Sequence, residues 1–144
     1  MEAKFLIFYC KLFFRDVHAM NIIHADIKPG NFLMVAGQLK LIDFGLAMEC
    51  IPGKKYLILW FFITSDVSGQ DFVQKRNLLG TKDYMSPEIL SGYIIENGEL
   101  DREAMMESEG VRYTKMVDIW ALGIILYNTI FTTQPFCNVP GNMR

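Results

Sequence analysis

Three polar side chains with complementary chemistry lie close together in the stretch IIHADIKPGNF, residues 22–32. Asp26 and Asn31 carry oxygen atoms, and Lys28 between them carries an ammonium group. Transfer of a phosphoryl group needs a carboxylate that orients the attacking hydroxyl, a cation on the moving phosphate and oxygen ligands for magnesium. Asp26 and Asn31 could hold an acceptor hydroxyl and a metal from one turn, while Lys28 reaches the phosphate as a point charge.

These side chains need local elements that bring them together. Pro29 and Gly30 favour a tight turn between Lys28 and Asn31. The following stretch, FLMVAGQLKLI, predicts two short strands around residues 36–38, with a glycine that eases the turn. Asp43 comes just after this hairpin, so the two strands would return a second carboxylate to the first turn. We therefore expect Asp43 to be the main magnesium ligand.

The elements on either side are less regular. Apolar residues recur at helical spacing before the turn, which predicts a helix over residues 1–20. Residues 46–88 are expected to be mostly loop. Within them, residues 54–64 form a dense apolar and aromatic run that is out of character for a mobile loop. It could be a core strand, a docking surface for a partner or translated non-coding sequence, and we favour the last.

Two further segments differ sharply in polarity. Residues 91–112 carry six acidic residues against two arginines, which is typical of a solvated surface insert. Residues 114–131 are apolar on nearly every side, so they predict a helix that is buried on most of its faces.

Composition limits the classes of function. The chain has 144 residues, of which 51% are hydrophobic and 21% charged, as in a globular domain. Its net charge of −2 gives no general attraction to nucleic acid or anionic lipid. The run at residues 54–64 is much shorter than the roughly 20 residues that span a bilayer. Three separated cysteines and no secretory signal predict an intracellular protein.

Four motifs occur in a fixed order along the chain: H-x-D-x-K-x-x-N, D-F-G, G-T-x-x-Y-x-x-P-E and D-x-W-x-x-G. In this order they resemble the C-terminal lobe of a eukaryotic protein kinase. The stretch HADIKPGNFLMVAGQLKLIDFGLA is similar to the monopolar-spindle (TTK-like) kinase group. The matching residues are His24, Asp26, Lys28 and Asn31, then 43–45, then Gly80, Thr81, Tyr84, Pro87 and Glu88, and finally Asp118, Trp120 and Gly123.

The resemblance implies an α+β fold over residues 1–144, a partial kinase domain that is mainly helical, with a hairpin carrying residues 22–45. It implies transfer of phosphate from ATP, with magnesium, to serine or threonine hydroxyls of a protein substrate. Asp26 would orient the hydroxyl and Lys28 would stabilise the charge on the phosphate. Asn31 and Asp43 would bind the metal, and Thr81 would steady Asp26 and Lys28.

The resemblance also assigns structural roles. His24 and Phe44 would pack in an apolar spine, and Asp118 would hold the backbone of the catalytic turn, residues 24–31. Ala25 stands where most kinases carry arginine, so a phosphate on the activation segment would need another partner. That partner would be one of three basic residues, Lys75, Arg76 and Lys82.

The chain lacks several motifs of the family. No G-x-G-x-x-G loop or V-A-I-K lysine precedes residue 22, so we expect the N-terminal lobe to be absent and the isolated chain to be inactive. Two alternatives to an enzyme stay open: a catalytically dead kinase-like binding module, and a truncated gene product without a stable fold of its own.

Overall fold

A computed structural model of the chain describes residues 16–50, 72–76, 79–92 and 110–136, and the backbone of residues 95–96 and 99–100. Most of the predicted helix over residues 1–20 lies outside the described residues, as does the apolar run at residues 54–64. The predictions for those two segments therefore stay untested.

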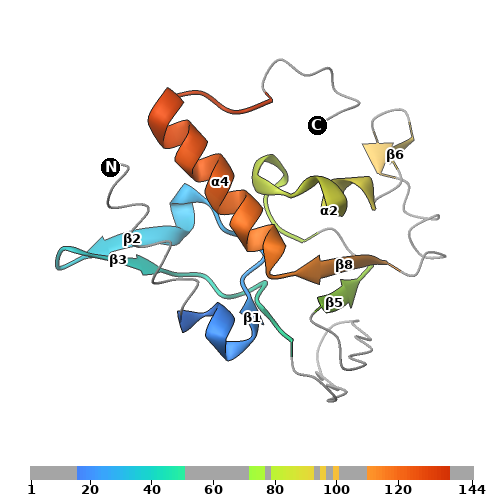
Figure 1. The fold of residues 1–144 in the computed structure, drawn as a ribbon, viewed down its shortest axis with the longest axis horizontal. Coiled ribbons are helices and arrows are strands. Elements are labelled where there is room, and N and C mark those ends of the chain that lie inside the picture. The colour runs from blue at the N-terminus through green and yellow to red at the C-terminus, as the bar shows by residue number, and fades with distance from the viewer. Residues whose placement is uncertain are drawn as a thin grey trace.

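Short antiparallel strands and one long helix make up the described part (Figure 1). The strands pair only in twos, as β1 with β4, β2 with β3, β5 with β8, and β6 with β7. In chain order the elements are η1 (His18–Met20), β1 (Ile22–Ile23), η2 (Pro29–Asn31), β2 (Phe32–Val35), β3 (Gln38–Leu41), β4 (Met48–Glu49), β5 (Phe72–Lys75), η3 (Lys82–Tyr84), α2 (Pro87–Ser91), β6 (Ile95–Glu96), β7 (Glu99–Leu100), β8 (Val111–Thr114) and α4 (Met116–Phe131).

The predicted hairpin after the catalytic turn is confirmed. β2 pairs with β3 from Phe32 opposite Leu41 to Val35 opposite Gln38. Ala36 and Gly37 connect the strands, with φ angles of 48° and 76°. Two successive residues at positive φ match the twist of an antiparallel pair, which is why this tight connection is favoured. Gln38, expected in the turn, instead begins β3.

A second antiparallel pair was not predicted. β5 pairs with β8, with Val73 opposite Tyr113 and Lys75 opposite Val111. Within residues 46–88, which we expect to be mostly loop, the structure therefore adds the strands β4 and β5. The solvated insert is also wrong at its C-terminal boundary, because Val111 is buried within β8.

Helix α4 lies across the middle of the molecule, with the β2–β3 hairpin on one side and the β5–β8 pair on the other (Figure 1). Its N-terminal half is buried on one side, at Val117, Asp118, Ala121, Leu122, Ile124 and Ile125, whereas Ile119 is 42% exposed. Its C-terminal half is more open, since Ile130 is 53% exposed and Phe131 is 57% exposed. We expected burial on most faces of this helix, whereas the structure buries only one side of its first half.

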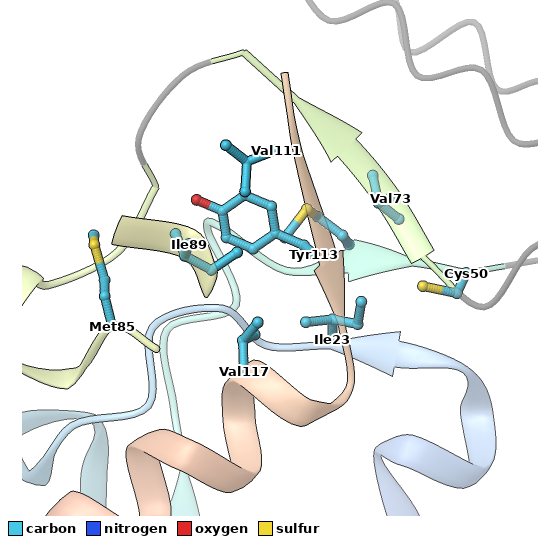
Figure 2. Close-up of a cluster of buried hydrophobic side chains, with 9 residues drawn as sticks. Ile23, Cys50, Val73, Met85, Ile89, Val111, Tyr113 and Val117 are labelled. Atoms are coloured by element: carbon cyan, nitrogen blue, oxygen red, sulfur yellow. The ribbon is translucent and has the colours of Figure 1, made fainter. Parts of the chain in front are cut away.

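Buried side chains form two hydrophobic clusters that meet at α4. The first gathers around Tyr113 between β5, β8 and the start of α4, as Figure 2 shows. The second joins Ala121, Leu122 and Ile125 of α4 to Val17, which precedes η1, and to Ile27, which lies within the turn that carries Asp26. Burial of an aliphatic side chain stabilises a fold by about 1.5–3 kcal/mol. Through Ile27, the second cluster therefore anchors the turn that carries Asp26 to α4.

The described residues have mixed α and β content with small antiparallel sheets, rather than the mainly helical content that we expected. Among the helices of this described part, none has both the length and the apolar character needed to cross a bilayer.

Candidate active site

The turn from Asp26 to Asn31 brings the predicted polar groups together. Pro29 begins the short helix η2, and the Asn31 N–H donates to the Lys28 carbonyl at 3.0 Å. The closed turn places the Asn31 amide beneath Asp26, where Asn31 Nδ2 donates to the Asp26 carbonyl oxygen at 2.8 Å and to Asp26 Oδ2 at 3.2 Å. Both residues are buried, so these hydrogen bonds fix the position of the carboxylate.

Lys28 and Thr81 complete the hydrogen bonds of the Asp26 carboxylate. Lys28 Nζ lies 2.7 Å from Asp26 Oδ2, and Thr81 Oγ1 donates to Asp26 Oδ1 at 2.7 Å. Lys28 Nζ also donates to Thr81 Oγ1 at 3.0 Å. The three side chains therefore form a closed triangle, in which Thr81 is brought in from a segment far along the chain.

The environment of Asp26 keeps its carboxylate ionised. Burial raises the pKa of Asp26, but the hydrogen bonds from Lys28, Thr81 and Asn31, together with the charge of Lys28, outweigh burial and lower the pKa below its ordinary value. Hydrogen bonds and opposite charges favour the charged form of a carboxyl group. Asp26 is thus an acceptor of hydrogen bonds at neutral pH.

Asp118 holds the backbone of the catalytic turn from α4, as the resemblance implies. Its Oδ2 accepts the His24 N–H at 2.9 Å and its Oδ1 accepts the Ala25 N–H at 2.9 Å. His18 Nε2 lies 2.8 Å from the same Oδ2. Ala25 has a φ angle of 65°, an unfavourable conformation for a residue other than glycine. Asp118 offsets that cost because it accepts both N–H groups on the strained turn.

His24 is a packed core histidine, as predicted. Its side chain is fully buried, its Nδ1 accepts the Asp26 N–H at 3.3 Å, and its Nε2 lies 3.3 Å from the Ile42 carbonyl. A backbone N–H can only donate, so Nδ1 is the acceptor and Nε2 carries the proton. The Phe44 ring packs edge-on against His24 with centroids 4.9 Å apart, yet Phe44 is 45% exposed. The two side chains therefore pack against each other, as the resemblance implies, although Phe44 is not fully buried.

Asp43 is connected to the Asp26 group only through its neighbour Ile42 in the hydrogen bonds of the described residues. The residue before it, Ile42, donates its N–H to the Asn31 carbonyl at 2.9 Å and accepts from His24. Asp43 itself is exposed, with φ at 62°, and its Oδ1 accepts the Gly45 N–H at 3.2 Å. In the described part of the chain, no hydrogen bond or ion pair links Asp43 directly to Asp26, Lys28 or Thr81.

The donors near this turn suit a hard cation. Asn31 uses its amide nitrogen for both hydrogen bonds to Asp26, which leaves Oδ1 as the metal-binding atom of that side chain. Asp43 adds an exposed carboxylate. Carboxylate and amide oxygens are the ligands that magnesium takes in proteins, usually with waters and phosphate oxygens completing the shell. The two residues therefore fit the expected ion chemically.

Sequence reasoning missed the parts of the site that come from β8 and from the segment before Thr81. The Leu79 N–H donates to Tyr113 Oη at 3.2 Å. Gly80 has a φ angle of 105°, and a Cβ at that position would lie 2.5 Å from the Ala25 carbonyl oxygen. The G-T pair contains this glycine in a family motif, but only the structure shows that its backbone touches the catalytic turn.

A small cavity lies beside the turn, and its lining includes Asp26, Thr81, Ser86 and Tyr113. Ser86 is completely buried, and within the described residues its Oγ has no hydrogen-bond partner.

The three basic residues that could pair with a phosphate differ in their surroundings. Burial lowers the pKa of Lys75, which lies on the inner side of β5, whereas Arg76 and Lys82 are exposed. Which of these three would pair with a phosphate stays a prediction.

Comparison with known proteins decides the family. The sequence profile of the protein kinase domain matches residues 12–144. The chain belongs to the protein kinase family. Similar curated kinases include the serine/threonine-protein kinase mph1 of Schizosaccharomyces pombe, 36% identical over 126 residues. The dual specificity protein kinase Ttk of Danio rerio is 34% identical over 123 residues, and the serine/threonine-protein kinase MPS1 of Saccharomyces cerevisiae is 30% identical over 147.

These matches cover 85%, 85% and 100% of the chain respectively. They cover only 15%, 10% and 17% of the kinases themselves, so the chain spans less than a fifth of the length of these relatives. The similarity to the monopolar-spindle kinase group, predicted from the stretch around Asp26 and Asp43, is confirmed.

Proposed function

We propose that this chain carries the phosphoryl-transfer residues of a kinase that modifies serine and threonine hydroxyls of intracellular protein substrates. The observation that carries the proposal is the closed group of Asp26, Lys28 and Thr81, with contacts of 2.7–3.0 Å between their side chains. This group differs from a surface ion pair, because its carboxylate is buried and also accepts a hydrogen bond from Thr81, a residue far along the chain.

Asp26 orients the acceptor hydroxyl. Each carboxylate oxygen can accept about two hydrogen bonds. Thr81 donates to Oδ1, whereas Oδ2 is shared by Lys28 and Asn31. Oδ1 therefore has the capacity for one more donor, which would be the hydroxyl of a serine or threonine substrate. The lowered pKa of Asp26 keeps this oxygen available as an acceptor at neutral pH.

Lys28 supplies positive charge where the phosphoryl group moves. Its side chain is 31% exposed, so the ammonium lies at the open edge of the group rather than sealed beneath it. Pairing with Asp26 and Thr81 fixes its position before substrate binds. A positioned cation costs no reorganisation when negative charge develops in the transition state.

Asn31 and Asp43 would hold magnesium, with Asn31 Oδ1 and the Asp43 carboxylate as ligands. The ion, bound with the phosphates of ATP, neutralises charge on the transferring group. The backbone link from Ile42 to Asn31 fixes the strand that leads into Asp43, which favours one shared site for the two ligands. The choice of serine or threonine acceptors is supported by Thr81 and by similarity to kinases named as serine/threonine or dual specificity.

An Asp26→Asn variant of the full-length protein tests this proposal in a phosphotransfer assay with ATP, magnesium and a serine- and threonine-containing protein substrate. We expect kcat to fall about 10²- to 10⁴-fold, because the asparagine cannot serve as a proton acceptor. Asp83→Asn is the matched control, since Asp83 is exposed on the nearby helix η3 and should retain wild-type activity. Equal activity of Asp26→Asn and wild type would refute the proposal.

A further inference from the structure

We propose that Tyr113 is a positioning residue: its hydroxyl holds the Leu79–Thr81 segment against the catalytic turn and so sets the Thr81 hydroxyl on Asp26. Within the enzyme this role rests on the proposed function. Tyr113 does not touch the group that would react. It acts through the backbone of Leu79.

The contact is a two-way clamp on one residue. The Leu79 N–H donates to Tyr113 Oη at 3.2 Å, and the Tyr113 O–H donates to the Leu79 carbonyl at 3.4 Å. Tyr113 is only 1% exposed, and its ring packs in the first hydrophobic cluster beside Ile89 and Val117 (Figure 2). The ring is therefore anchored, and the hydroxyl is presented from a rigid base.

The clamp acts on a segment that the strand ladder does not hold. β5 ends at Lys75, and its last pair is with Val111 of β8. Leu79 lies beyond this ladder and outside every described strand and helix. A backbone N–H and C=O in a partly buried loop need partners. Tyr113 provides both from a single side-chain oxygen.

A displacement of Leu79 would be transmitted to the catalytic turn through its neighbour Gly80. The backbone of Gly80 is so close to Ala25 that a Cβ would lie 2.5 Å from the Ala25 carbonyl oxygen. Thr81 is the next residue in the chain, and its Oγ1 lies 2.7 Å from Asp26 Oδ1 and 3.0 Å from Lys28 Nζ. A hydrogen bond weakens steeply as its geometry is lost. Small displacements of Leu79 should therefore weaken the hydrogen bond from Thr81 to Asp26.

A purely structural role for Tyr113 would need only its ring. Phenylalanine would keep the buried ring and remove the hydroxyl alone, so a Tyr113→Phe variant separates packing from clamping. Two controls match it. Val73→Ala weakens the same cluster from the opposite strand, because Val73 is buried and pairs with Tyr113, but it leaves the Tyr113 hydroxyl and Leu79 in place. Tyr127→Phe removes a hydroxyl from a partly exposed tyrosine on α4.

The experiment measures amide hydrogen exchange at Leu79, Gly80 and Thr81 together with steady-state kinetics, using the full-length protein. In Tyr113→Phe we expect the Leu79 amide to exchange about tenfold faster, as for the loss of one hydrogen bond. We expect kcat to fall about tenfold, with the KM for ATP unchanged, because Thr81 steadies the carboxylate rather than the nucleotide. Val73→Ala should speed exchange across the whole cluster, and Tyr127→Phe should change neither quantity.

Two results would overturn the inference. One is wild-type exchange at Leu79–Thr81 in Tyr113→Phe. The other is accelerated exchange spread over the cluster to the same extent as in Val73→Ala. The exchange measurement does not depend on activity, so an inactive wild-type protein would refute the proposed function while exchange still decides whether Tyr113 positions the segment.

Discussion

Asp118 gives the sharpest stability prediction, because one buried carboxylate accepts two backbone N–H groups of the catalytic turn and also contacts His18 of η1. Oδ1 accepts the Ala25 N–H, and Oδ2 accepts the His24 N–H and contacts His18 Nε2. The Asp118→Asn variant preserves the size of the side chain but leaves one acceptor oxygen in place of two. In either orientation of the amide, a backbone N–H of the turn would face an NH₂ group.

The magnitude follows from these contacts. A hydrogen bond to a charged group contributes about 1.5–3 kcal/mol, and the bonds that remain would lose the strength that the negative charge gives them. We therefore expect Asp118→Asn to lower the free energy of unfolding by about 2–4 kcal/mol. A change of about 3 kcal/mol is roughly a 150-fold change in the unfolding equilibrium. This is a large part of the total stability of a typical domain, about 5–15 kcal/mol.

Urea denaturation followed by tryptophan fluorescence measures this loss, since Trp120 lies on α4 two residues after Asp118. Asp83→Asn is the control: it makes the same chemical change at an exposed carboxylate, and we expect a change within about 0.5 kcal/mol. If Asp118→Asn were as stable as this control, Asp118 would not be what fixes the turn, and its three contacts would be incidental.

Two further predictions concern the segment that carries Thr81. Thr81→Val removes a hydroxyl that helps to lower the pKa of Asp26, so the pKa of Asp26 should rise. The acidic limb of the pH–kcat profile should then move to higher pH, and an unshifted limb would show that Thr81 does not affect the pKa of Asp26. Gly80→Ala should lower kcat by tenfold or more, because the added Cβ would lie 2.5 Å from the Ala25 carbonyl oxygen and the φ angle of 105° disfavours alanine. A wild-type kcat in this variant would mean that the segment can shift without affecting Asp26.

The pKa of Asp26 also links the site to stability. A carboxyl group whose pKa is lowered in the folded state stabilises that state above the ordinary pKa of the group. This contribution is lost as the pH falls through the lowered value. The Asp26 network should therefore contribute fully at neutral pH and weaken only in acid.

The chemistry of the site could be predicted from the sequence where the residues that form it lie close together in the chain. Asp26, Lys28 and Asn31 lie within one turn, and the tight connection at Ala36–Gly37 fixes the hairpin that follows. Thr81 could be assigned only through resemblance to a family, because nothing local shows that it meets Asp26. The closed geometry of these side chains is what the structure adds.

The β5–β8 pair could not be predicted for a physical reason. Each strand has four residues, too few for alternation to stand out, and its partner lies far away along the chain. Val111 follows a run of acidic residues, so polarity placed it in a surface insert although its side chain is buried. The role of Tyr113 depends on this pairing and was therefore invisible in the sequence.

The central claim is that the Asp26 turn and Asp43 serve one metal and phosphate site. Titration of the full-length protein with Mn²⁺ in the presence of ATP, followed by electron paramagnetic resonance, tests it most directly. We predict that Asp43→Asn and Asn31→Leu each weaken Mn²⁺ binding by tenfold or more, as expected for loss of a ligand of this type, while Asp83→Asn leaves it unchanged. Wild-type Mn²⁺ affinity in either ligand variant would contradict the claim.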